Sequence, residues 1–116
     1  MMQTEQLIKK VQSILDDMKA KDLVILDVTG KSSVTDFMLI ASGTSRRHVV
    51  SMAGEVLEKV KAEGVQPIGS EGQESGDWIL VDLGDLVVHL MMPDARSFYD
   101  LERLWRHSPE DAEALS

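Results

Sequence analysis

The sequence predicts a single α/β domain in which helices pack on a mixed β-sheet of about five strands. Three observations support this prediction. A charge-free apolar run at residues 37–41 precedes a small-residue turn and a long helical pattern. Further along, two apolar runs flank Gly84-Asp85, which is a strong hairpin signal. The chain has 116 residues, and a chain of this length forms one domain that buries about two thirds of its unfolded surface.

The composition indicates the cellular compartment of the protein and the kind of partner that it binds. Cysteine is absent, which excludes thiolate chemistry and a disulfide framework. The N-terminus lacks the apolar core of a signal peptide and no run reaches membrane-spanning length, so we expect a cytoplasmic protein. The net charge is −8 and the 12 Lys and Arg are scattered, with local clusters only at 46–48 and 103–107. A basic protein partner therefore fits the chain better than naked nucleic acid does.

The first half of the chain predicts a helix and a β-hairpin. Thr4 can cap the helix. Residues 23–28 form a strand that is apolar on both faces, and a loop at 29–33 joins it to the strand at 37–41. The short loop makes the two strands antiparallel, and the absence of charge indicates that the second is covered on both faces. The apolar stripe of the helix consists of Leu7, Ile8, Val11, Ile14, Leu15 and Met18.

A small-residue turn leads from the second strand into the longest helix. Thr44 or Ser45 can cap this helix. Gly64, which follows Lys59 and Lys61, marks its end, where cations favour the negative pole of the helix dipole. The packed face of the helix consists of Val49, Val50, Ala53, Val56, Leu57 and Val60.

The second half predicts three strands and a last helix. Pro67 places residues 65–68 at a sheet edge, if they form a strand at all. Residues 69–77 are a Gly-rich acidic loop, and strands at 78–83 and 86–91 follow it on either side of the turn.

The last helix opens at Pro93 or Asp94 and precedes an acidic tail. The element order is therefore α-β-β-α-β-β-β-α. We expect residues 108–116 to be disordered, which leaves a domain at 1–107. The packed side of the helix consists of Phe98, Leu101 and Trp105.

Enzymatic templates fail on spacing. A phosphate-binding P-loop needs a second glycine followed by Lys and Ser or Thr, and Gly43 has none of these. A nucleophile elbow needs a glycine two residues after its serine, and Arg47 occupies that place after Ser45. The histidines lack the spacing of metal ligands and are interpreted as structural or surface residues, so no metal or cofactor is expected. They are His48, His89 and His107.

Nucleotidyl transfer is the enzymatic alternative. Such enzymes hold a triphosphate at a strand–turn–helix junction like the one at 37–49. They also carry two carboxylates, two residues apart on one strand face, that bind two metal ions. Asp82 and Asp85 lack this spacing, and the strand-end residues Asp27 and Asp36 are expected to be satisfied locally. Catalysis is therefore not expected.

Apolar residues set among acidic ones predict a protein-binding surface. Trp78 follows a loop and starts a strand, where its ring is either part of the core or a contact anchor. Leu83 lies beside the turn glycine, and apolar residues at hairpin tips tend to be exposed. Together with Met91 and Tyr99, they would form an apolar centre with a negative rim.

Several long blocks occur in the order and spacing of a known family. They are Asp27-Val28 with GKSS at 30–33, TDFMLIASGTSRRHV at 35–49, Glu71-Gly72, DWILVDLGDLVVHLM at 77–91, and YDLERLW at 99–105. On these blocks the chain resembles the ribosomal silencing factors, the RsfS or Iojap family, over nearly its full length. Only the acidic tail after Trp105 departs from the pattern.

The resemblance implies an α/β fold related to nucleotidyltransferases but lacking their catalytic carboxylates. It implies binding to the fourteenth protein of the large ribosomal subunit, on the face that meets the small subunit. Occupying that face would block subunit joining and repress translation under nutrient limitation. Direct contact with ribosomal RNA would be minor or absent.

The resemblance also indicates which residues meet the partner. The resemblance also implies a tendency to form homodimers, and the same apolar face could serve there, so that dimer formation and ribosome binding would compete. Carried over by position, the contact residues are Trp78, Leu83, Asp85 and Tyr99, with Asp82 and Met91 as further candidates.

Overall fold

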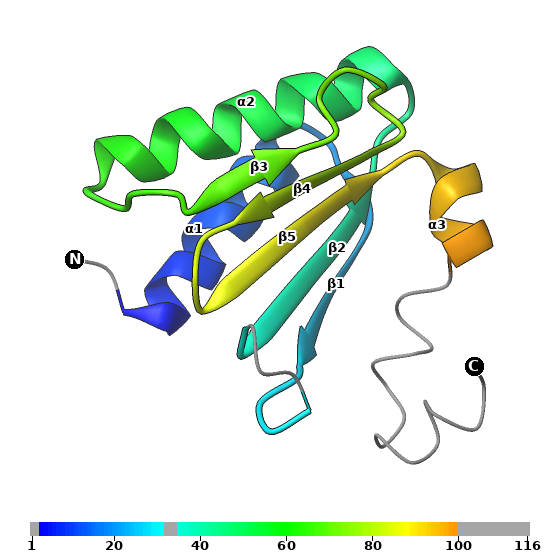
Figure 1. The fold of residues 1–116 in the computed structure, drawn as a ribbon. Coiled ribbons are helices and arrows are strands. Elements are labelled where there is room, and N and C mark those ends of the chain that lie inside the picture. The colour runs from blue at the N-terminus through cyan, green and yellow to red at the C-terminus, as the bar shows by residue number, and fades with distance from the viewer. Residues whose placement is uncertain (1–2, 32–34, 100–116) are drawn as a thin grey trace.

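The computed structural model describes residues 3–31 and 35–99, and its elements follow the predicted order (Figure 1). Leu101, Trp105 and the acidic tail lie outside the described residues. Within the described part of the chain, no helix is long and apolar enough to cross a membrane. The elements are α1 (Thr4–Asp17), β1 (Lys21–Asp27), β2 (Phe37–Ser42), α2 (Arg46–Ala62), β3 (Gly69–Glu71), β4 (Trp78–Asp82), β5 (Leu86–Met91) and α3 (Pro93–Tyr99).

The strands form one mixed sheet in the order β1-β2-β5-β4-β3. β1 and β2 form the predicted antiparallel hairpin, and β4 and β5 form the second one around Gly84. β2 and β5 run parallel at the centre, which is possible because a long connection through α2, β3 and β4 separates them. Both central strands are buried along nearly their whole length, which confirms that the run at 37–41 is covered on both faces.

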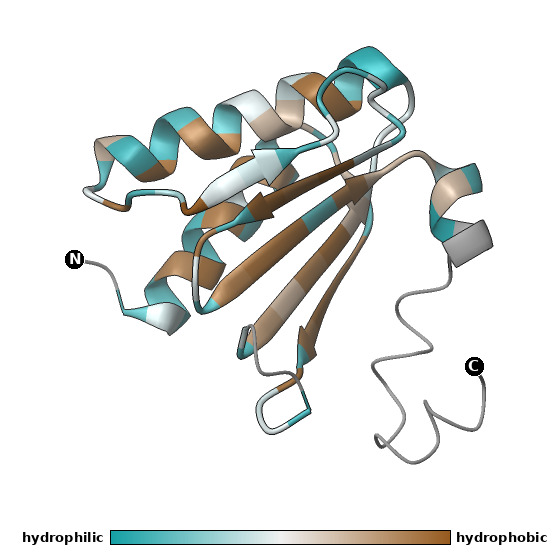
Figure 2. Ribbon diagram, in the orientation of Figure 1, coloured by the Kyte–Doolittle hydropathy of each residue, from teal (hydrophilic) through white to brown (hydrophobic). Residues whose placement is uncertain are grey.

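The two faces of the sheet carry different layers. α1 and α2 cover one face, as Figure 1 shows, and the main core lies between them and the strands. Because successive side chains of a strand point to opposite faces, Leu39 and Ala41 enter this core while Met38 and Ile40 face away. The apolar strands of the centre stand out in Figure 2. A smaller cluster lies on the second face and consists of Leu26, Val28, Met38, Ile40 and Met91, with Ala95 of α3 against it.

α2 shows which of two predicted caps is used. The Ser45 Oγ accepts a hydrogen bond of 3.0 Å from the backbone N–H of His48, so Ser45 is the N-cap. Gly64 follows the helix with a φ of +86°, as its predicted role requires. The predicted packing of Val50 is wrong: Val50 is 39% exposed, whereas Met52 is fully buried. At 3.6 residues per turn the buried stripe is Val49, Met52, Ala53, Val56 and Val60, and Val50 lies beside it.

α1 begins one residue earlier than its predicted cap, Thr4, implies. Gln3 is the N-cap, and its backbone N–H donates to Oε1 of Gln6 at 3.2 Å. Thr4 is already helical. Its hydroxyl instead donates to Oδ2 of Asp85 at 3.0 Å, which joins the start of α1 to the β4–β5 turn.

The edge strands also differ from the prediction. β1 is not covered on both faces, because it lies at the edge of the sheet and Ile25 is 36% exposed. Residues 65–68 form no strand, and the strand lies further on, at Gly69–Glu71, inside the predicted loop. Pro67 has no N–H to donate, whereas the acidic segment pairs with the free edge of β4, with Gly69 opposite Asp82. An edge strand of this kind needs no apolar run.

The tight turn before α2 predicts a clear contrast between two glycines. A β-carbon on Gly43 would lie 2.7 Å from Cγ2 of the buried Val49, so Gly43→Ala should lower the free energy of unfolding by about 1–3 kcal/mol. Gly54 is exposed within α2 and has open space around it, so Gly54→Ala should raise this free energy by about 0.5–1 kcal/mol. Urea unfolding measures both, and a Gly43→Ala protein as stable as the parent would contradict the packing described.

Candidate partner-binding site

The predicted contact residues lie at two ends of the β4–β5 hairpin. Trp78 opens β4 and is paired with Met91, the last residue of β5. Asp82, Leu83 and Asp85 surround the turn, about 16 Å away along the strand. Tyr99 ends α3, and its side chain lies outside the described residues. The structure therefore does not gather these residues into a single apolar centre.

Leu83 and Trp78 also belong to opposite faces of the sheet. Leu83 is 7% exposed and lies in the core beneath the helices, so the expectation that it is exposed at the hairpin tip is wrong. Met91 is fully buried on the second face. The alternation of a strand explains this result, because Leu83 shares the parity of Ile79 and Val81 in the sequence. That signal was available from the sequence alone.

The β4–β5 turn is held by its own acidic residues. Oδ1 of Asp82 accepts from the backbone N–H of Gly84 at 2.9 Å, and the N–H of Leu83 donates to the carbonyl of Leu86 at 2.9 Å. Gly84 has a φ of +93°, which favours glycine. Asp82 thus acts within the turn, whereas Asp85 is exposed and is positioned by the Thr4 hydroxyl. Of the predicted acidic contacts, Asp85 is the one that a partner can reach most freely.

Trp78 is half-buried and is oriented by a histidine. Its ring packs against the cluster on the second face, and its Nε1–H donates to Nδ1 of His89 at 3.0 Å. His89 is 4% exposed, and burial lowers its pKa to about 4, so it is neutral near pH 7. Its buried Nε2 has no hydrogen-bond partner among the described residues. The sequence predicted that His89 is a structural or surface residue but gave no sign that it holds Trp78.

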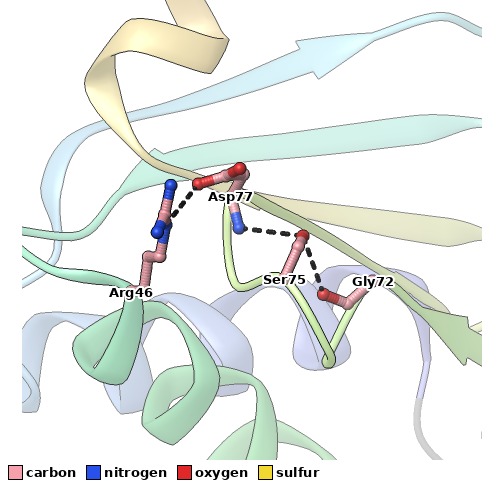
Figure 3. Close-up of polar contacts among 4 residues, drawn as sticks. All are labelled: Arg46, Gly72, Ser75 and Asp77. Carbon is pink, nitrogen blue, oxygen red and sulfur yellow. Dashed lines mark hydrogen bonds and ion pairs between the residues drawn. The ribbon is translucent and has the colours of Figure 1, made fainter.

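A cleft of about 610 Å³ lies beside Trp78. The loop before β4 forms one wall and is closely packed, since a β-carbon on Gly72 would collide with the carbonyl oxygen of Trp78. Figure 3 shows how this loop is tied: Nε of Arg46 donates to Oδ1 of Asp77 at 2.7 Å, and the Asp77 N–H donates to Oγ of Ser75 at 3.2 Å. The lining residues are Arg46, Ser75, Asp77, Trp78, Met92, Asp94 and Ala95.

The strand–turn–helix junction is occupied by structural hydrogen bonds. Nδ1 of His48 accepts from the Thr44 N–H at 3.0 Å, so its Nε2 carries the proton and donates to the Met18 carbonyl at 2.7 Å. His48 therefore ties α2 to the end of α1. This role agrees with the structural interpretation of the histidines.

Asp27, one of the aspartates considered for an enzyme, is used locally. Oδ1 of Asp27 accepts from the Thr29 N–H at 3.0 Å, and this hydrogen bond lowers the pKa of Asp27. Among the described residues, no three His, Asp or Glu side chains are grouped so that they could hold a metal ion.

These features define a class of protein, a small α/β domain whose candidate residues are used in turn hydrogen bonds and side-chain packing. The family described as "Ribosomal silencing factor during starvation" (RsfS) matches residues 1–116, and the chain belongs to this family.

Individual relatives agree in sequence and in fold. The chain is 46% identical over 99 residues to the ribosomal silencing factor RsfS of Haemophilus influenzae, and the matched region covers 85% of this chain and 97% of that protein. It is 35% identical over 96 residues to the mouse protein "Mitochondrial assembly of ribosomal large subunit protein 1", and the matched region covers 80% of this chain and 42% of that protein. A crystal structure of a Chromobacterium violaceum protein is similar with a TM-score of 0.88 and 43% identity, over 92% of this chain and 89% of that one.

The buried histidine predicts a pH dependence of stability. The pKa of His89 is about 4 in the folded protein and near 6.5 in an unfolded chain. As pH falls, the unfolded state therefore binds a proton first. The contribution of His89 to the free energy of unfolding is complete above about pH 6.5 and is lost between about pH 6.5 and pH 4, by up to about 3 kcal/mol.

Urea unfolding at a series of pH values tests this dependence. Between about pH 6.5 and pH 4, the free energy of unfolding of His89→Leu should fall less steeply than that of the parent protein, whatever its value at pH 7. Equal slopes for the two proteins would contradict the assignment of this pH dependence to His89.

Proposed function

We propose that this chain is a ribosomal silencing factor that binds the large ribosomal subunit through its fourteenth protein. Bound there, it sterically blocks the joining of the small subunit and represses translation under nutrient limitation. The observation that carries the proposal is the family match over residues 1–116. The mouse relative is itself named for the ribosomal large subunit. Such a role places the chain with ribosomes, in the cytoplasm.

The charge of the chain supports a basic protein as the partner. The net charge is −8, and a ribosomal protein that lies on RNA is basic. Complementary charge accelerates encounter and sets orientation, while contacts at the centre of an interface supply most of the affinity. The same charge disfavours direct contact with ribosomal RNA. Asp85 supports this role best, because it is exposed and held in place by Thr4.

The remaining candidate residues fall into two groups, those that would touch the partner and those that would hold the contact surface in place. Trp78 is a proposed contact on the accessible part of its half-buried ring, and Tyr99 stays a prediction on position in the family. Leu83 and Met91 are buried, so we propose that they support the contact surface from beneath. Asp82 supports it by holding the turn.

Steric exclusion needs no catalysis, so we propose that the chain is not an enzyme and needs no cofactor. The alternative, a nucleotidyltransferase-like enzyme, predicts nucleotide binding with a divalent metal. The described residues offer it no grouped metal ligands, and the Thr44 amide at the helix junction is already bonded to His48.

Co-sedimentation with isolated ribosomal subunits tests the proposal at Asp85. The parent protein should pellet with large subunits and not with small ones. Asp85→Asn keeps an oxygen that can accept from Thr4 but loses the charge, so it should weaken binding by about 1 kcal/mol or more and reduce the salt dependence. Glu58→Gln, on the exposed side of α2, changes the net charge equally and should bind as the parent does. Pelleting with neither subunit would contradict the proposed function.

Trp78 gives a second test. Trp78→Ala should weaken large-subunit binding by ~2 kcal/mol or more if the ring is a hot spot. Because the ring is half-buried and bonded to His89, the substitution should also lower the free energy of unfolding, so binding must be compared at a temperature where both proteins are folded. Folded Trp78→Ala that binds normally would remove Trp78 from the contact surface.

A possible homodimer would compete with the ribosome if both use one face. Sedimentation of the free protein over a range of concentrations gives its oligomeric state. A contact substitution that abolishes ribosome binding and leaves a dimer intact would contradict a shared face.

A further inference from the structure

An exposed isoleucine lies at the β4–β5 turn, where the sequence had placed an exposed leucine. Ile68 is 71% exposed, which is far more than the other exposed large apolar residues of the described chain, Ile25 at 36% and Val50 at 39%. Its neighbour in space is the turn itself, because a β-carbon on Gly84 would lie 3.6 Å from Cδ1 of Ile68. The apolar side chain exposed at this turn is therefore Ile68, while Leu83 is buried under the helices.

The backbone beneath Ile68 is fixed. Its N–H donates to the carbonyl of Asp82 at 2.8 Å, and β3 starts at the next residue, with Gly69 opposite Asp82. Pro67 restricts the chain before it. Because this backbone is already held in place, covering Ile68 costs little backbone entropy, so its burial would go largely into affinity.

Charge next to Ile68 indicates what would cover it. Asp85 follows Gly84 directly, is exposed, and is held by the Thr4 hydroxyl at 3.0 Å. The turn thus presents one apolar group beside one fixed carboxylate, on a chain of net charge −8. The complementary surface is an apolar depression flanked by Lys or Arg on a basic protein.

We propose that Ile68 is a partner-contact residue that inserts into such a depression while Asp85 meets the flanking cation. This inference rests on the proposed function, since it takes the basic partner to be a protein of the large ribosomal subunit. It makes the turn end of the hairpin, with Ile68, Asp85 and Thr4, a contact surface in its own right, separate from Trp78 at the other end.

The test measures the affinity of immobilised protein for isolated large ribosomal subunits at fixed salt. Ile68→Ala should raise the Kd about tenfold or more, because it removes most of a side chain that the partner buries. Ile25→Ala is the matched control: it removes the same atoms from an exposed isoleucine on β1, and its Kd should stay within about twofold of the parent value. Thermal unfolding of each variant shows that it is folded when its Kd is measured.

The outcomes separate this inference from the proposed function. Parent protein that binds large subunits, together with Ile68→Ala that binds equally well, would overturn the role of Ile68 and leave the silencing function standing. Parent protein that binds neither subunit would overturn both. An Ile68→Ala protein that loses self-association in sedimentation but keeps its affinity for large subunits would show that a second copy covers Ile68, which also overturns the proposal.

Discussion

The register of the β4–β5 hairpin decides which side chains a partner can reach. The Leu83–Leu86 backbone bond and the Asp82–Gly84 side-chain bond fix the turn. Alternation along β4 then sends Ile79 towards the helices with Leu83, and Trp78 to the opposite face. A slip of one residue would exchange the two faces and expose the core. The hydrogen bonds of this turn therefore determine the proposed contact surface as well as the packing.

Much of the fold could be predicted from sequence because its signals are local. Both hairpins depend on neighbouring residues and are confirmed, and of the two predicted caps of α2, Thr44 or Ser45, the structure uses Ser45. β3 could not be predicted, because an exposed edge strand pairs through its backbone and carries no apolar pattern. The exposure of Leu83 was inferred from its place at a tip, although its strand parity indicated burial. The relation to nucleotidyltransferases stays a prediction.

The candidate site was harder to predict because its key contacts join residues that are distant in sequence. Trp78 and His89 are diagonal neighbours across two strands, since Trp78 is opposite Met91 and His89 is opposite Leu80. Thr4 and Asp85 are separated by 81 positions. The exposure of Ile68 depends on how β3 begins against β4, which the sequence did not reveal. Register and tertiary contact, rather than residue type, decide each of these.

An enzyme depends on reactive groups, whereas a protein that acts by covering a partner's surface depends on contact residues that are held rigidly in place. At the turn, the Thr4 hydroxyl ties α1 to Asp85, and the carbonyl of Asp82 holds the backbone of Ile68. An apolar group and a charge are thus fixed relative to each other before any partner arrives, which reduces the entropy lost on binding. In the proposed role, deletion of one hydrogen bond in this frame would weaken binding by loosening the turn. The affinity proposed for this end of the molecule would therefore be a property of the folded turn as much as of the side chains that it presents.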